Sequence, residues 1–154
     1  MKSKLRATVV AGMVVQRKQN FLLVQELKGY DKGKWWLPSG QVDFGENPVC
    51  SAEREFFEET GYHARATAFL GVFSVRRLDR EPKSPRHALR FIFTGELLDV
   101  KPRAKIDTAQ ARWFSRQEIR LLALRTKDLT EILDRYMEGV RYPLDVISHN
   151  EELR

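Results

Sequence analysis

Three glutamates near the middle of the chain have the spacing of a cation site. Glu55, Glu58 and Glu59 stand at positions i, i+3 and i+4, so on a helix they project from one face. Carboxylate oxygens are the ligands that Mg²⁺ and Mn²⁺ prefer. Like charges at this spacing cost a bare helix about a few tenths of a kcal/mol, and a bound cation reverses that cost. A cation held in this way suits a substrate that carries phosphate groups.

The glutamates belong to a longer pattern between residues 40 and 62, which reads GQVDFGENPVCSAEREFFEETGY. This pattern resembles the signature of the Nudix hydrolases, here Gly-x5-Glu-x7-Arg-Glu-Phe-x-Glu-Glu-x-Gly-Tyr. All seven fixed positions are filled, and a chance match at a given start is on the order of one in 10^8. Phe56 and Tyr62 stand where the family more often carries aliphatic residues, a change that affects packing and leaves the carboxylates in place. The fixed residues are Gly40, Glu46, Arg54, Glu55, Glu58, Glu59 and Gly61.

A pair of glutamates on a helix is often no more than a solvated face. Solvation leaves the glycines, Glu46 and Arg54 unexplained, so we favour a cation site. Arg54 lies four residues before Glu58 and can pair with it or with Glu46. The resemblance implies that Arg54 and Glu46 brace the loop and the helix. It also implies that the backbone carbonyl of Gly40 joins the metal shell, although a glycine needed only for the turn explains Gly40 equally well.

The resemblance further implies metal-dependent hydrolysis of a phosphoric anhydride. Glu55, Glu58 and Glu59 would bind Mg²⁺ or Mn²⁺, which neutralises phosphate oxygens and lowers the pKa of the attacking water. The general base varies within the family, and Glu59 or Glu55 is our first choice. Asp107 is the second, because many relatives carry a carboxylate shortly before the strand predicted at 111–114. A loop cap explains Asp107 equally well.

Side chains for the rest of the substrate are less clearly defined. Aromatic faces stack on nucleobases, which makes Trp35, Trp36 and Phe44 candidates. Adjacent strand residues point to opposite faces, so core packing explains one of the two tryptophans equally well. The basic stretch 76–90 offers guanidinium groups that bind phosphates bidentately, with a solvated hairpin loop as the alternative. Its candidate residues are Arg76, Arg77 and Arg90.

Local signals define the elements that must position these residues. Asn47 is the expected N-cap of the motif helix, Pro48 its first residue and Gly61 its C-terminal glycine. Strands are predicted at 4–15, 21–26, 35–37, 66–75, 88–98 and 111–114. A capping box at Ser115 predicts a helix to about residue 124, and Thr126 is the expected cap of a last helix that runs to residue 137. Helices on both faces of a mixed sheet fit this order, and the resemblance implies the same α/β/α sandwich.

Length and composition predict a single domain. A chain of 154 residues with 42% hydrophobic content can form one core and is too short for two ordinary domains. We expect a Nudix domain over 1–148 and a polar tail over 149–154. The single cysteine, Cys50, excludes an intrachain disulfide and fits a reducing, cytoplasmic compartment. The apolar run 7–15 is too short to span a bilayer and lacks a cleavage site, so we expect neither a leader nor membrane binding.

Charge is distributed unevenly along the chain. The net charge is +6, while the motif segment carries six acidic residues against one arginine, so it contributes −5 and the remainder +11. An acidic site in a basic protein suits a polyanion that arrives with a divalent cation. We expect the substrate to be a free nucleoside di- or triphosphate, including an oxidised one. The alternatives are a hydrolase of capped RNA, ADP-ribose or dinucleotides, and a non-catalytic nucleotide sensor. The sequence does not define the quaternary state, and it is compatible with a homodimer.

Overall fold

A computed structural model of the chain describes residues 6–78, 86–107 and 109–150. Within these residues, seven strands form a mixed sheet in the order β3-β2-β1-β6-β5, with β4 paired to β1 and β7 to β2. The pairing of β1 with β6 is parallel, whereas the other strand pairs are antiparallel. The strands are β1 Thr8–Arg17, β2 Asn20–Glu26, β3 Trp35–Trp36, β4 Ser39–Gln41, β5 Ala64–Arg77, β6 Arg86–Leu97 and β7 Ala109–Ser115. Of the predicted polar tail, residues 151–154 lie outside the described part.

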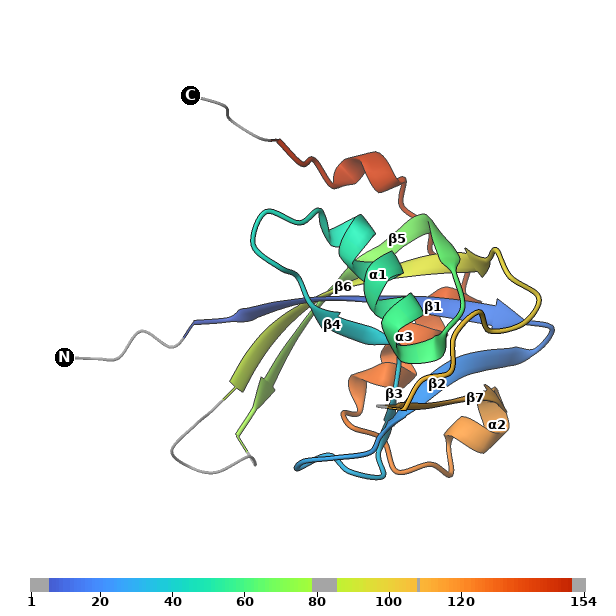
Figure 1. Ribbon diagram of the computed structural model, residues 1–154. Helices are drawn as coiled ribbons and strands as arrows, with labels where there is room; N and C mark the ends of the chain where they lie inside the picture. The colour runs from blue at the N-terminus through green and yellow to red at the C-terminus, as the bar shows by residue number, and fades with distance from the viewer. Residues whose placement is uncertain (1–5, 79–85, 108, 151–154) are drawn as a thin grey trace.

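Helices cover both faces of this sheet (Figure 1). The helices are α1 Pro48–Thr60, α2 Arg116–Ile119 and α3 Asp128–Met137, and a 3-10 turn, η1, covers Leu144–Val146. α1 packs on one face, where Phe56 joins Met13 of β1, while α3 packs on the other, where Leu133 joins Val14. Successive residues of β1 therefore serve the two opposite cores, as expected for a strand buried on both sides. The predicted α/β/α sandwich is confirmed, and no helix in the described part is long and apolar enough to cross a bilayer.

The ends of α1 follow the predicted chemistry. The side chain of Asn47 accepts a hydrogen bond from the Val49 N–H at 2.8 Å, and Pro48 occupies the first turn. Gly61 has φ of +75° and donates its N–H to the Phe57 carbonyl, a conformation that a residue with a side chain adopts only with strain. The helix that carries the glutamates is thereby fixed at both ends.

Two predicted helix boundaries were wrong, and both depend on long-range contacts. The helix after Ser115 ends at Ile119, because the chain leaves it to pair with β3: the Trp35 N–H donates to the Ala123 carbonyl at 2.8 Å. Thr126 does not cap α3, whose N-cap is Lys127 without a side-chain bond. The Thr126 hydroxyl instead accepts from Arg90 Nη1 at 2.8 Å. β4 was also not predicted, since Gly40 within it and Pro38 directly before it are residues typical of a loop.

Asp99 links the chain after α1 to the turn after β6 through hydrogen bonds. One carboxylate oxygen accepts from the His63 N–H at 2.8 Å, and the other from Arg103 Nε at 2.7 Å. The Arg103 hydrogen bond, with those of His63, lowers the pKa of Asp99 from 3.8 to about 2. A lowered folded pKa means that this stabilisation is complete above the unfolded pKa and is lost as the pH falls through the folded one.

We therefore expect Asp99→Asn to lower the Tm at pH 7, with a difference from wild type that shrinks as the pH falls from 3.8 toward about 2. Thermal unfolding followed by circular dichroism across this range checks it. Asp145→Asn, at an exposed position of η1, is the control and should leave the Tm unchanged. A difference between Asp99→Asn and wild type that does not depend on pH would contradict the prediction.

Candidate active site

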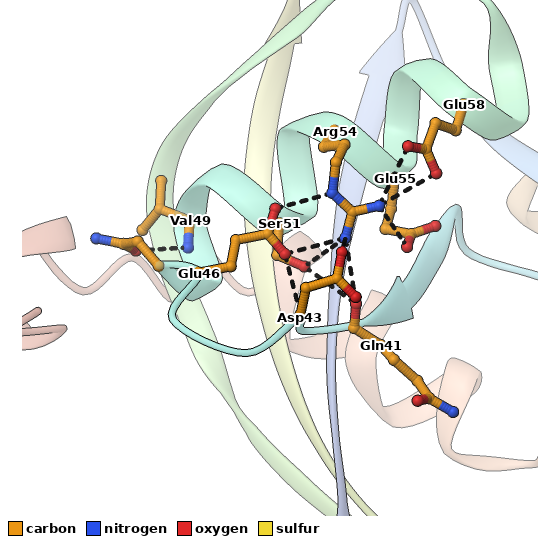
Figure 2. A network of polar contacts seen from close by, with 9 residues as sticks. Gln41, Asp43, Glu46, Val49, Ser51, Arg54, Glu55 and Glu58 are labelled. Carbon is orange, nitrogen blue, oxygen red and sulfur yellow. Dashed lines mark hydrogen bonds and ion pairs between the residues drawn. The ribbon is translucent and has the colours of Figure 1, made fainter.

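Arg54 is the centre of the polar network beside α1 (Figure 2). Its Nε and Nη2 atoms donate to the two carboxylate oxygens of Glu46 at 2.8 and 3.0 Å. Its Nη1 atom donates to Glu55 at 2.9 Å and to Glu58 at 3.1 Å. The sequence allowed Arg54 to pair with Glu46 or with Glu58, and the structure contains both pairs. The single guanidinium therefore ties the loop before α1 to two glutamates of the motif face.

This network holds more negative than positive charge. Asp43 approaches Arg54 at 3.5 Å, so four carboxylates surround one guanidinium. The hydrogen bonds from Arg54 lower the pKa of Glu46 to about 2, and Glu46 in turn raises the pKa of Arg54. Glu55 differs, because burial raises its pKa despite its bond to Arg54. An excess of negative charge is the electrostatic condition for binding a cation.

Glu59 lies on the same face of α1 but has a different partner from Glu55 and Glu58. One of its oxygens accepts a hydrogen bond from the Ser39 N–H at 3.0 Å. Burial, together with the charge of Glu55, raises the pKa of Glu59 to about 8. The carboxylate is therefore held against the backbone of β4, with its second oxygen available for another partner.

Gly40 is required by close approach. A Cβ built on Gly40 would lie 2.1 Å from Cδ of Glu55, far inside van der Waals contact. The glycine lies in β4, opposite Ala11 of β1, so neither a turn nor a left-handed backbone explains it. The place of a side chain at this position is taken by the Glu55 carboxylate. Whether the Gly40 carbonyl binds a metal stays a prediction.

The chemistry of the motif side chains fits a hard divalent cation. In the described part of the chain, no three acidic, histidine or cysteine side chains are already grouped closely enough to hold one, because Glu55 and Glu58 face Arg54 while Glu59 faces Ser39. Their oxygen donors are nevertheless the type that Mg²⁺ prefers. Burial is the main cause of the raised pKa values of Glu55 and Glu59, so a nearby cation would stabilise their charged forms.

A cavity of about 130 Å³ adjoins β4. It is lined by Ser39 and Gly40, the two residues of β4 that also contact Glu59 and Glu55. The cavity and the carboxylates therefore meet at this short strand. The other lining residues are Thr8, Val10, Trp36, Gln41, Val75, Arg77, Arg86, His87, Ala88, Arg90 and Arg125.

Only some of the expected substrate-binding residues line the cavity beside β4. Trp35 does not line the cavity and packs edge-on against Phe114 in the core, with ring centroids 4.7 Å apart; its neighbour Trp36 lines the cavity instead. Arg77 and Arg90 line the cavity, whereas Arg76 does not and is exposed on β5.

Phe44 is also outside this cavity. Its side chain is fully exposed in the loop before α1 and does not line the hollow beside β4. A stacking role for Phe44 receives no support from this arrangement, since stacking needs a ligand held against the ring.

Arg125 is a cavity residue that sequence reasoning missed. It follows the segment that pairs with Trp35, where its own N–H donates to the Trp35 carbonyl at 3.0 Å. Its guanidinium contacts Glu26 and Asp31, each at 3.2 Å. No local pattern marks this arginine, because its place depends on a contact between segments some ninety residues apart in the chain.

Asp107 reaches a different hollow. It is exposed before β7 and lines, together with Glu59, Tyr62 and Trp113, a hollow of about 560 Å³. This hollow shares no lining residue with the cavity beside β4. The two candidate bases, Glu59 and Asp107, therefore open to the same space.

Comparison with known proteins agrees with the family that the sequence motif resembles. The family model of the NUDIX domain matches residues 5–136. The chain is 34% identical over 143 residues to phosphatase NudJ of Escherichia coli K12, covering 90% of this chain and 89% of that protein. It is 32% identical over 143 residues to human 8-oxo-dGDP phosphatase NUDT18, covering 88% of this chain and 41% of that protein, so it spans less than half of NUDT18. A NUDIX hydrolase structure from Nitrosomonas europaea superimposes with a TM-score of 0.85 at 29% identity, covering 94% of this chain and 98% of that one.

Proposed function

The chain belongs to the Nudix family as a pyrophosphohydrolase of nucleoside diphosphate derivatives, and we propose that its substrate is a free nucleoside di- or triphosphate. We also propose that the reaction depends on a divalent cation. One observation carries this proposal: the carboxylates of α1 and an arginine-lined cavity meet at Ser39 and Gly40. This arrangement suits a ligand with a polyphosphate at one end and a nucleoside at the other.

The carboxylates of Glu55, Glu58 and Glu59, with the Gly40 carbonyl, would hold Mg²⁺ or Mn²⁺. Such an ion supplies charge neutralisation at phosphate oxygens and a bound water of lowered pKa. Arg54 keeps Glu55 and Glu58 oriented through its fixed donor fork, as residues behind metal ligands commonly do. Glu46, whose carboxylate holds two of the Arg54 donors, anchors this arginine to the loop.

Glu59 is the favoured general base. One oxygen is engaged by the Ser39 N–H, which fixes the carboxylate and leaves the other oxygen to take a proton from water. Glu55 is the second motif choice, although it is already bonded to Arg54. Asp107 remains the alternative outside the motif, since it opens to the same hollow as Glu59.

We include oxidised nucleotides among the proposed substrates. NUDT18, the human relative, is named an 8-oxo-dGDP phosphatase, which supports including oxidised guanine nucleotides among the substrates. The proposal does not extend beyond the shared domain, because the chain covers 41% of that protein.

A substrate panel tests the proposed function. Release of phosphate, pyrophosphate and monophosphate would be measured with Mg²⁺ for nucleoside di- and triphosphates, 8-oxo nucleotides, nucleotide sugars, ADP-ribose, dinucleoside polyphosphates and capped RNA. We expect turnover of free di- or triphosphates that EDTA abolishes. Preferred turnover of capped RNA, ADP-ribose or dinucleotides would replace this substrate, and metal-dependent binding without turnover of any compound would support a sensor.

A further inference from the structure

The cavity beside β4 has an unusual wall of hydrogen-bond donors. Arg77, Arg86, Arg90 and Arg125 all line it, and a guanidinium donates hydrogen bonds but never accepts them. Trp36 has a donor only, whereas Thr8, Ser39, Gln41 and His87 can donate or accept, so the excess of donors comes mainly from the arginines. In the part of the chain that the structure describes, no carboxylate lines this cavity.

Carboxylates outside the wall hold three of these arginines. Asp31, which is 2% exposed, accepts from Arg77 at 2.8 and 3.1 Å and contacts Arg125 at 3.2 Å. Asp128 accepts from Arg90 Nη1 at 2.8 Å. Each carboxylate fixes a guanidinium from outside the cavity, so the wall is preorganised before a ligand enters.

The same pairs offset part of the charge of the wall. Glu26 also contacts Arg125, so three carboxylates, Asp31, Asp128 and Glu26, offset the four arginines together with Lys34, which lies 3.3 Å from Asp31. Directional donors whose charge is partly offset suit a neutral acceptor edge better than another phosphate, which gains most from uncompensated positive charge.

Arg90 gives part of the wall a flat, rigid surface. The residue is 5% exposed, and its guanidinium carbon lies 4.4 Å from the centroid of the Trp36 ring. Backing by an aromatic ring and bonding to Asp128 together restrict the movement of the guanidinium. A planar ring of a ligand suits such a surface.

From this donor wall we propose that the cavity recognises a base whose edge presents oxo groups, such as hypoxanthine or uracil, in preference to adenine or cytosine. The inference rests on the proposed function, because it assigns the nucleoside to this cavity. The oxo group of hypoxanthine or uracil accepts from arginine, whereas the amino group of adenine or cytosine presents N–H groups to donors. A buried donor left without an acceptor makes the amino base bind more weakly.

Matched pairs of ligands test this inference without turnover. Inosine and adenosine monophosphates differ by an oxo-for-amino exchange that also turns the adjacent ring nitrogen from an N–H donor into an acceptor, and uridine and cytidine monophosphates differ in the same way. We expect the oxo member of each pair to bind at least about 10-fold more tightly, measured by calorimetry on the full chain without metal. Equal affinities, or tighter binding of the amino member, would overturn the inference.

Two variants connect the preference to the wall. Arg125→Gln places a group that can accept as well as donate at the wall, so the ratio within each pair should fall toward one. Arg120→Gln makes the same change at an exposed position at the end of α2 and should leave the ratio unchanged. If Arg125→Gln does not fold, the affinity ratios that the wild-type protein shows within the two ligand pairs test the inference by themselves.

The remaining outcomes are also distinct. Preference for a ligand with an added 3′-phosphate regardless of its base would overturn the inference and assign the arginines to phosphate. A base preference in binding, with no hydrolysis of the corresponding di- and triphosphates, would support the inference while the proposed function fails.

Discussion

Replacement of Glu59 by glutamine is expected to lower kcat by about 10³-fold, the size of effect expected when a group that takes a proton in the transition state is removed. An amide neither takes the proton nor binds a divalent cation as a carboxylate does. The amide oxygen can still accept from the Ser39 N–H, which Glu59 now engages at 3.0 Å. The contact between α1 and β4 is therefore retained, and the loss should appear in kcat at saturating substrate and Mg²⁺.

The same substitution should not destabilise the metal-free protein. Burial raises the pKa of Glu59 to about 8, which means that the ionised carboxylate is less stable in the folded protein than in water. A neutral side chain of the same shape removes that cost. We therefore expect Glu59→Gln to unfold at or above the wild-type Tm, so that loss of activity cannot be attributed to loss of structure.

Glu53→Gln is the matched control on the same helix. Glu53 lies on the opposite side of α1 and accepts from the Ala66 N–H at 2.9 Å, a bond that an amide oxygen can replace. Its activity should stay close to wild type. Activity retained by Glu59→Gln would exclude this residue as base and ligand, and a large loss of kcat in Asp107→Asn would then assign the base to the loop before β7.

Local chemistry made α1 and its glutamates predictable. Asn47 and Pro48 at one end of α1 and Gly61 at the other are signals that each act on the adjacent turn of helix, and the structure contains all three as expected. The face shared by Glu55, Glu58 and Glu59 follows from helical periodicity alone. Which acidic partner Arg54 would choose was left open because both lay within reach, and one guanidinium has enough donors for both.

The cavity was less predictable, because its residues meet through pairings distant in the chain. Alternation along a strand predicts that two adjacent tryptophans point to opposite faces, but the pairings of β3 with β2 and with residue 124 determine that Trp36, and not Trp35, lines the cavity. Arg90 and Asp128 are 38 residues apart, and no local pattern connects them. Sequence periodicity places a residue on a face, whereas the fold determines which other element that face meets.

Gly40→Ala is expected to lower activity by about 10²-fold, although alanine is the smallest possible change, because displacement of a catalytic group by about 1 Å has effects of this size. The added Cβ would lie 2.1 Å from Cδ of Glu55, so the carboxylate must leave its position against β4. Its bond to Arg54 at 2.9 Å would be strained or lost with it. Steady-state kinetics with Mg²⁺ titration would show the loss.

Two further variants separate this clash from backbone strain. Gly45 has φ of +77° with open space around its Cβ position, so Gly45→Ala should lower the Tm through strain and leave Glu55 in place. Equal losses of activity in Gly40→Ala and Gly45→Ala would attribute the effect to loop conformation.

In Gly40→Ala/Glu55→Asp, the shorter side chain withdraws from the added methyl group, so the double variant should be no less active than Glu55→Asp alone. Such non-additivity is the signature of two positions in direct contact, and additive losses would show that Gly40 acts independently of Glu55.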